Sequence, residues 1–83
     1  MRFERIVYGY HARGRMKRRC ISHAEAKRIL NAPDITHPGN KPDRVVARGR
    51  LGDGREGGVV YTEEHDFDAD VFVVTVLDFE ADQ

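Results

Sequence analysis

A run of seven residues near the C-terminus, Val71–Leu77, constrains the fold most. Every residue in it except Thr75 is apolar, and four of them are valine. This density of β-branched residues favours a strand, and apolar side chains on both faces predict a central position in a sheet. Two weaker strands are predicted before it, over 44–51 and 58–63, with a turn at Gly52-Asp53-Gly54 between them. Three strands with short connections predict an antiparallel meander.

The N-terminal half is predicted to hold a strand-like lead-in over 3–8 and then two helices. Ala12, Met16 and Cys20 recur every four residues and form the apolar stripe of a helix that begins at Tyr10 and ends near residue 19. Ser22-His23-Ala24-Glu25 is a capping box, the clearest helix start in the chain. The second helix then runs to Asn31-Ala32-Pro33, because the backbone before a proline disfavours the helical conformation.

These elements predict one α+β domain over residues 1–83, with an N-terminal helical pair packed on a three- to four-stranded antiparallel sheet. The tail, residues 78–83, is expected to fray. Cys20 is the only cysteine, which favours a reducing compartment. No apolar run approaches the roughly 20 residues that span a bilayer, and no signal-peptide core follows the N-terminus. We therefore expect a cytoplasmic protein with no membrane partner.

The formal net charge is zero, yet the charges are unevenly distributed. Residues 1–30 carry nine Lys or Arg against two Glu, and residues 31–60 carry five basic and four acidic side chains. Residues 61–83 carry eight acidic side chains and no Lys or Arg. This asymmetry predicts either a polyanionic partner for the basic part or pairing of the two ends within the fold. Both alternatives stay open at this point.

The segment His11-Ala12-x-x-Arg15-Met16-x-x-Arg19-x-Ile21-Ser22, followed by a helix that ends in Asn31-Ala32-Pro33-Asp34, resembles a widespread bacterial family of domains of unknown function. The strand patterns fit its order of elements, and the resemblance covers roughly residues 6–77. That family is distantly similar to the BrnT and RelE toxins of bacterial toxin–antitoxin pairs, small ribonucleases with helices packed on an antiparallel sheet. The resemblance therefore implies this fold, an RNA-directed activity and an antitoxin partner.

Two departures from the pattern stand out. Cys20 replaces the glycine usual after the first helix, where a left-handed backbone favours Gly. The C-terminal segment is acidic, whereas RelE-type toxins often place basic or aromatic catalytic residues late in the chain.

A metal-independent ribonuclease needs a base for the 2′-hydroxyl proton, cations for the phosphorane charge and an acid for the leaving oxygen. His11 is the candidate base or acid, with Arg15 and Arg48 as the candidate charge-stabilising residues. The candidate RNA-binding residues are Arg13, Lys17, Arg18, Arg19, Arg50 and Tyr61. The structural alternative makes His11 a helix-start residue packed on the sheet, and pairs the arginines with Glu63, Glu64 and the Asp-rich end.

Other chemistries are disfavoured. No pair among the four histidines has a recognised metal-ligand spacing, and Cys20 is expected to be a small buried residue, so no metal or cofactor is predicted. Gly57 and Gly58 are expected to be hairpin glycines. The second helix offers only Lys27 and Arg28 beyond its cap, which argues against specific DNA recognition.

The sequence therefore predicts a toxin-like module that binds or cleaves RNA, either active as an endoribonuclease or diverged and inactive. The alternative is a non-enzymatic module that binds a protein partner through an exposed sheet edge or a charged face. The oligomeric state stays open.

Overall fold

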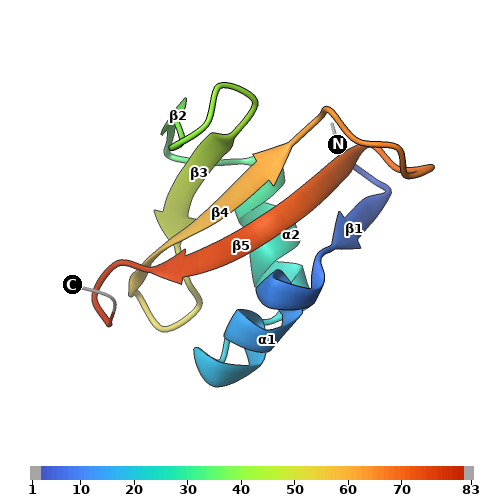
Figure 1. Cartoon of the computed structure of the whole chain (residues 1–83). Helices are drawn as coiled ribbons and strands as arrows, with labels where there is room; N and C mark the ends of the chain where they lie inside the picture. Colours follow the sequence, from blue (N-terminus) through green and yellow to red (C-terminus); the bar gives the residue numbers. More distant parts are fainter. Residues whose placement is uncertain (1–2, 82–83) are drawn as a thin grey trace.

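Five strands form one sheet, and two helices lie together on one of its faces (Figure 1). The computed structural model describes residues 3–81. The elements in chain order are β1 (Ile6–Tyr8), α1 (Tyr10–Arg18), α2 (His23–Asn31), β2 (Ile35–Pro38), β3 (Val45–Arg50), β4 (Glu56–Thr62) and β5 (Val71–Asp78). The strand order across the sheet is β1-β5-β4-β3-β2. The prediction of an α+β domain with a helical pair on a sheet is confirmed.

The sheet is larger and more mixed than predicted. It has five strands rather than three or four, and β1 runs parallel to β5, with Ile6 opposite Val71 and Tyr8 opposite Val73. All other pairings are antiparallel. A parallel pair needs a long crossover connection, and here the helices and the other strands supply it. β5 lies between β1 and β4, so its predicted interior position is confirmed.

The first helix ends differently from its predicted apolar stripe. Ala12 and Met16 are buried in the core, but Cys20 is exposed and lies beyond the helix. The backbone of Cys20 is left-handed, with φ 55°, and the N–H of Ile21 donates to the carbonyl of Met16 at 2.9 Å. This is a Schellman motif, in which the residue after the cap reverses the chain and is normally glycine. The prediction of a buried cysteine was wrong because this turn directs residue 20 away from the core.

The second helix begins at the predicted capping box. The Glu25 N–H donates to the Ser22 hydroxyl at 3.0 Å, and the Ser22 N–H donates to the Glu25 carboxylate at 2.9 Å. The other Glu25 oxygen accepts from the N–H of Gly52 at 2.6 Å, which ties the cap to the turn after β3. On the core side the helix buries Ala26, Ile29 and Leu30, the predicted apolar face.

Two glycines lie inside β4 rather than in a hairpin turn. A Cβ at Gly57 would approach Leu51 Cγ to 2.9 Å, and a Cβ at Gly58 would approach Phe79 Cε2 to 2.8 Å. Leu51 therefore packs over the backbone of Gly57 on one face of β4, and Phe79 packs over the backbone of Gly58 on the other. The prediction of hairpin glycines was wrong because their role depends on these distant partners.

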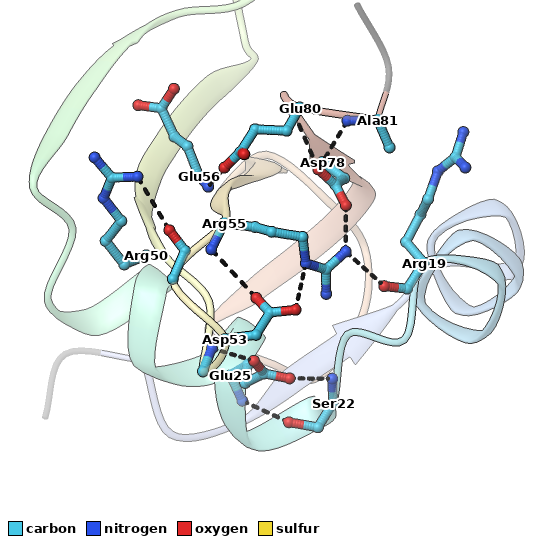
Figure 2. Close-up of polar contacts among 12 residues, drawn as sticks. Arg19, Ser22, Glu25, Arg50, Asp53, Arg55, Glu56, Asp78, Glu80 and Ala81 are labelled. Carbon is cyan, nitrogen blue, oxygen red and sulfur yellow. Dashed lines mark hydrogen bonds and ion pairs between the residues drawn. The ribbon is translucent and has the colours of Figure 1, made fainter.

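The end of β5 is fixed rather than frayed, as far as residue 81. Asp78 is buried, and its carboxylate accepts from the Arg55 guanidinium and from the N–H groups of Glu80 and Ala81 (Figure 2). The same Arg55 side chain donates to the carbonyl of Arg19 at the end of α1. Residues 82 and 83, the rest of the predicted tail, lie outside the described residues.

Candidate nucleic-acid interface

The outer face of α1 carries a cluster of basic and aromatic side chains. Because α1 turns Ala12 and Met16 toward the core, the residues on the other side of the helix face outward. The outward-facing residues are Tyr10, His11, Arg13, Lys17 and Arg18, which we call the α1 face. The helix contains no acidic residue, so its exposed surface is uniformly positive.

A shallow hollow of about 520 Å³ lies over this face. It is lined by the five residues of the α1 face and by Gly14. A Cβ placed on Gly14 would meet no atom within 4 Å, so the space above the helix backbone is open there. Glycine inside a helix costs about 1 kcal/mol relative to alanine, and it allows close approach of a ligand to the backbone. The hollow is therefore a place where an anion can reach the helix surface between several cations.

The cations of the α1 face are not neutralised by the acidic part of the chain. Within residues 3–81, no ion pair joins Arg13, Lys17 or Arg18 to a carboxylate. The C-terminal acids pair elsewhere: Asp68 with Arg5 at 2.7 Å, and Asp78 with Arg55. The fold thus pairs Arg5 near one end with Asp68 near the other, yet leaves the positive charges of Arg13, Lys17 and Arg18 available.

Two of the predicted arginines on this segment have structural contacts. The Arg15 Nε donates to the carbonyl of Val76 at 2.9 Å, which ties α1 to β5. The backbone of Arg19 forms the helix cap and accepts from Arg55 at 3.2 Å. Neither residue lines the hollow over the α1 face.

The remaining predicted arginines lie on β3, on the opposite face of the sheet. The neighbours of Arg48 face the helices, because Ala47 is in the core and a Cβ at Gly49 would contact Ile29 of α2 at 3.3 Å. The Arg48 guanidinium therefore points away from the helices, pairs with Glu56 at 2.8 Å and lies 3.8 Å from the ring centre of Phe79.

Arg50 shares the face of Arg48, and its guanidinium donates to the carbonyl of Gly54 at 3.1 Å. The structure thus does not bring His11 and Arg48 together, because a helix and the sheet separate them.

Tyr61 and Tyr10 both differ from expectation. Tyr61, a predicted RNA-stacking residue, is only 5 % exposed, and its ring contacts Phe3 edge-on at 5.4 Å between centres. It shares the core face of β4 with Val59, two residues before it. Tyr10, predicted only as the first residue of the helix, is 88 % exposed beside the hollow. Its position two residues before Ala12, on the side of the helix opposite the Ala12 and Met16 stripe, was the signal that would have identified it.

Two further observations concern metals and membranes. Within the described residues 3–81, no group of three or more His, Cys, Asp or Glu side chains is placed to hold a metal ion. Neither helix there has the length and apolar character that crossing a bilayer requires.

Comparison with known proteins gives one result. The sequence model of a family described as "Domain of unknown function (DUF4258)" matches residues 8–78. No curated protein and no solved structure matches the chain. The family match spans α1, α2 and β2 to β5, and thus most of the fold. The chain therefore belongs to the DUF4258 family.

Proposed function

We propose that this domain binds RNA through the α1 face, as a toxin-like module of the RelE and BrnT kind. The observation that carries the proposal is the hollow over Gly14, ringed by Arg13, Lys17 and Arg18, none of which pairs with a carboxylate within residues 3–81. A polyanion gains most from cations of this kind, because no internal ion pair has to break first.

Single-stranded RNA suits this surface better than a duplex. The exposed ring of Tyr10 offers a platform on which an unpaired base can stack, beside cations that hold the adjoining phosphates. The α1 face has no Asn or Gln to read base edges, so binding tolerates many sequences.

RNA cleavage is the stronger form of the proposal. An imidazole exchanges a proton near neutral pH, and His11 lines the hollow together with Arg13 and Arg18. In this proposal Arg13 and Arg18, rather than the predicted Arg15 and Arg48, are the arginines that line the hollow with His11 and stabilise a developing phosphorane charge. The overall arrangement, two helices on one face of a mainly antiparallel sheet, is in line with the fold that the RelE and BrnT resemblance implies.

Binding is tested with a fluorescently labelled single-stranded RNA and the matching duplex, by anisotropy at several salt concentrations. Lys17→Ala is expected to weaken RNA binding. It should also reduce the slope of the logarithm of the binding constant against the logarithm of the salt concentration by roughly 0.7, the value for one phosphate contact on a single strand. Lys27→Ala, which removes the same charge from α2, is the matched control and should leave both unchanged. Equal effects of the two substitutions would reject the α1 face as the RNA site.

Cleavage is tested separately, by incubating total RNA with purified protein in the presence of a chelator. His11→Ala should abolish cleavage while RNA binding persists, and His23→Ala on α2 should cleave like the unmodified protein. Absence of cleavage by the unmodified protein would leave binding alone as its activity. Cleavage that survives His11→Ala would remove His11 from the mechanism.

An antitoxin protein is the partner that the toxin-like proposal implies. Coexpression with candidate neighbouring genes, followed by copurification, tests it. The second candidate function, a non-enzymatic module that binds a protein, draws on a different surface: the sheet face away from the helices, with half-buried Val60, Val74 and Leu77. Both functions can coexist, since the two surfaces lie on opposite sides of the sheet.

A further inference from the structure

The sheet face away from α1 and α2 is apolar, and neither helix covers it (Figure 1). β5 reads as an almost continuous apolar run, which is typical of a strand that is covered on both faces. In residues 3–81 the helices cover only one of them: Val71, Val73 and Val76 are fully buried, while Val74 and Leu77 stay half-exposed. The composition of β5 thus fits a sheet with a layer on each side.

A β-bulge increases the apolar area of this face. Val60 pairs with Thr75 and Tyr61 pairs with Val73, so Val74 has no partner on β4. The extra residue lets Val74 and Thr75, neighbours in sequence, both point to the open face. Bulges of this kind re-aim side chains at functional surfaces.

The open face contains a hollow of about 410 Å³ with an apolar floor and a basic rim. Val46, Val60, Val74 and Leu77 are the floor, and no acidic residue lines the hollow. Lys41 and Arg44, from the loop after β2, belong to its rim.

The basic rim continues along β3. Arg48 and Arg50 point to the same face as Arg44 and Val46, because alternate residues of a strand share a face. A row of basic side chains therefore runs along one side of the apolar floor. Arg44 in this row pairs with Asp43 at 2.6 Å and Arg48 pairs with Glu56 at 2.8 Å, whereas within residues 3–81 no ion pair joins Lys41 or Arg50 to a carboxylate.

From this arrangement we infer that the open face binds an amphipathic α-helix of a partner protein, with acidic residues along the edge of the helix that lies over β3. The strand β4, which runs under the hollow, has no free edge to offer, because it is paired on both sides, by β3 and β5. A segment that buries its backbone against this floor must satisfy its own N–H and C=O groups, and a helix does so internally. The apolar side of such a helix matches the floor, and its acidic edge matches the cations.

Charge disfavours a second copy of this chain as the occupant. Pairing of two copies about a two-fold axis at the hollow brings the same patch from both sides, so the interface holds Lys41 and Arg44 of both copies and no acidic lining residue to match them. Like charges at an interface oppose association. The partner is thus a different, acidic chain, and this inference does not depend on RNA binding at the α1 face.

The test uses two designed helical peptides of about 18 residues, five turns, that share the same leucine face. One carries Glu along one edge and the other carries Lys at the same positions. Fluorescence anisotropy with the 83-residue chain is expected to show at least about tenfold tighter binding of the Glu peptide, since like charges across an interface cost more than opposite charges gain. Lys41→Glu should reduce this preference, whereas Lys17→Glu, the same charge change on α1, should leave it intact.

Val74→Asp should abolish binding of the Glu peptide, and a thermal melt followed by circular dichroism shows whether that variant is folded. If it does not fold, the Lys41→Glu and Lys17→Glu pair still decides the question. Equal binding of both peptides, or binding of neither up to about 1 mM, would overturn the inference. A dimer in light scattering that Lys41→Glu strengthens would also overturn the inference, since a second copy would then occupy the face. So would saturable binding of the fatty acid decanoate to this face, since the occupant would then be a small apolar anion.

Discussion

The guanidinium of Arg55 donates to the buried carboxylate of Asp78, and this pair joins three parts of the chain (Figure 2). Arg55 precedes β4, Asp78 ends β5, and the same guanidinium contacts the carbonyl of Arg19 after α1. Burial alone raises the pKa of Asp78, but the N–H groups of Ala81 and Glu80 and the Arg55 charge together hold it below its ordinary value. The carboxylate is therefore charged and fully paired.

Asp78→Asn is expected to lower the melting temperature by about 5 to 10 °C, because a neutral group replaces the buried partner of Arg55, which keeps its ion pair with Asp53 at 2.6 Å. Asp68→Asn removes the partner of Arg5 from an exposed ion pair and should lower it by at most about 5 °C. Thermal melts of both variants measure the difference. Equal effects would show that the Arg55–Asp78 pair does not fix the end of β5.

Stability should fall as the pH drops below about 4.5. The backbone N–H groups of Ser22 and Gly52 donate to Glu25 and hold its pKa below the ordinary value. The backbone N–H groups of Arg5 and Glu4 do the same for the pKa of Asp70. The unfolded chain therefore takes up protons at a higher pH than the folded one. The contribution of these carboxylates is present above the unfolded pKa and is lost as the pH falls through the folded pKa.

Urea unfolding at a series of pH values from about 7 to 2.5 measures this loss. Glu25→Gln should flatten the pH dependence in part, because it removes one of the titrating groups. A free energy of unfolding that stays constant or rises below about pH 4.5 would contradict the prediction.

Glu25→Ala should destabilise the protein by about 1 to 2 kcal/mol, because it removes the capping box and the hydrogen bond to the N–H of Gly52. Glu25→Gln should cost less, since glutamine at this position still reaches the Ser22 N–H. Chemical denaturation at neutral pH gives both values. A larger loss for Gln than for Ala would be inconsistent with a capping role.

Cys20→Gly should stabilise the protein by roughly 0.5 to 1 kcal/mol, because glycine adopts the left-handed backbone without strain, and its greater freedom in the unfolded chain offsets part of the gain. Cys20→Ala, which keeps the Cβ, should give no such increase. Comparing the urea unfolding midpoints of the two variants separates the effect of the left-handed backbone from the effect of losing the thiol. A gain for Ala that equals the gain for Gly would point to the thiol instead.

Gly14→Ala should raise stability by about 1 kcal/mol, since the new methyl group meets no atom within 4 Å and alanine favours the helix. If RNA approaches the helix backbone at this point, the same substitution weakens RNA binding. The expected result is a higher melting temperature in a thermal melt together with a lower RNA affinity by anisotropy. Unchanged RNA affinity would place the phosphate contacts elsewhere on the α1 face.

Local signals identified most of the elements. The capping box at Ser22 fixed the start of α2, the alternation over 44–51 placed Val45 and Ala47 on the core face of β3, and the apolar run of β5 predicted an interior strand. Each of these depends on interactions within a few residues or on the period of one element, which a sequence displays directly.

The candidate site was less predictable, because it depends on which faces the fold covers. His11, Arg13, Lys17 and Arg18 do share one exposed surface, as a single helix allows. Arg48 and Tyr61 fall on opposite faces of the sheet, one pointing away from the helices and the other buried beneath them.

The sequence by itself determined the α+β class, the helix cap and the strongly basic first helix. Only the tertiary structure decided that β1 joins β5 in parallel, that Gly58 makes room for Phe79 and that Asp78 is clamped by Arg55. The reason is physical: capping and periodicity act over one turn or one strand, whereas these contacts join residues that are distant in the chain and become neighbours only when the whole sheet assembles.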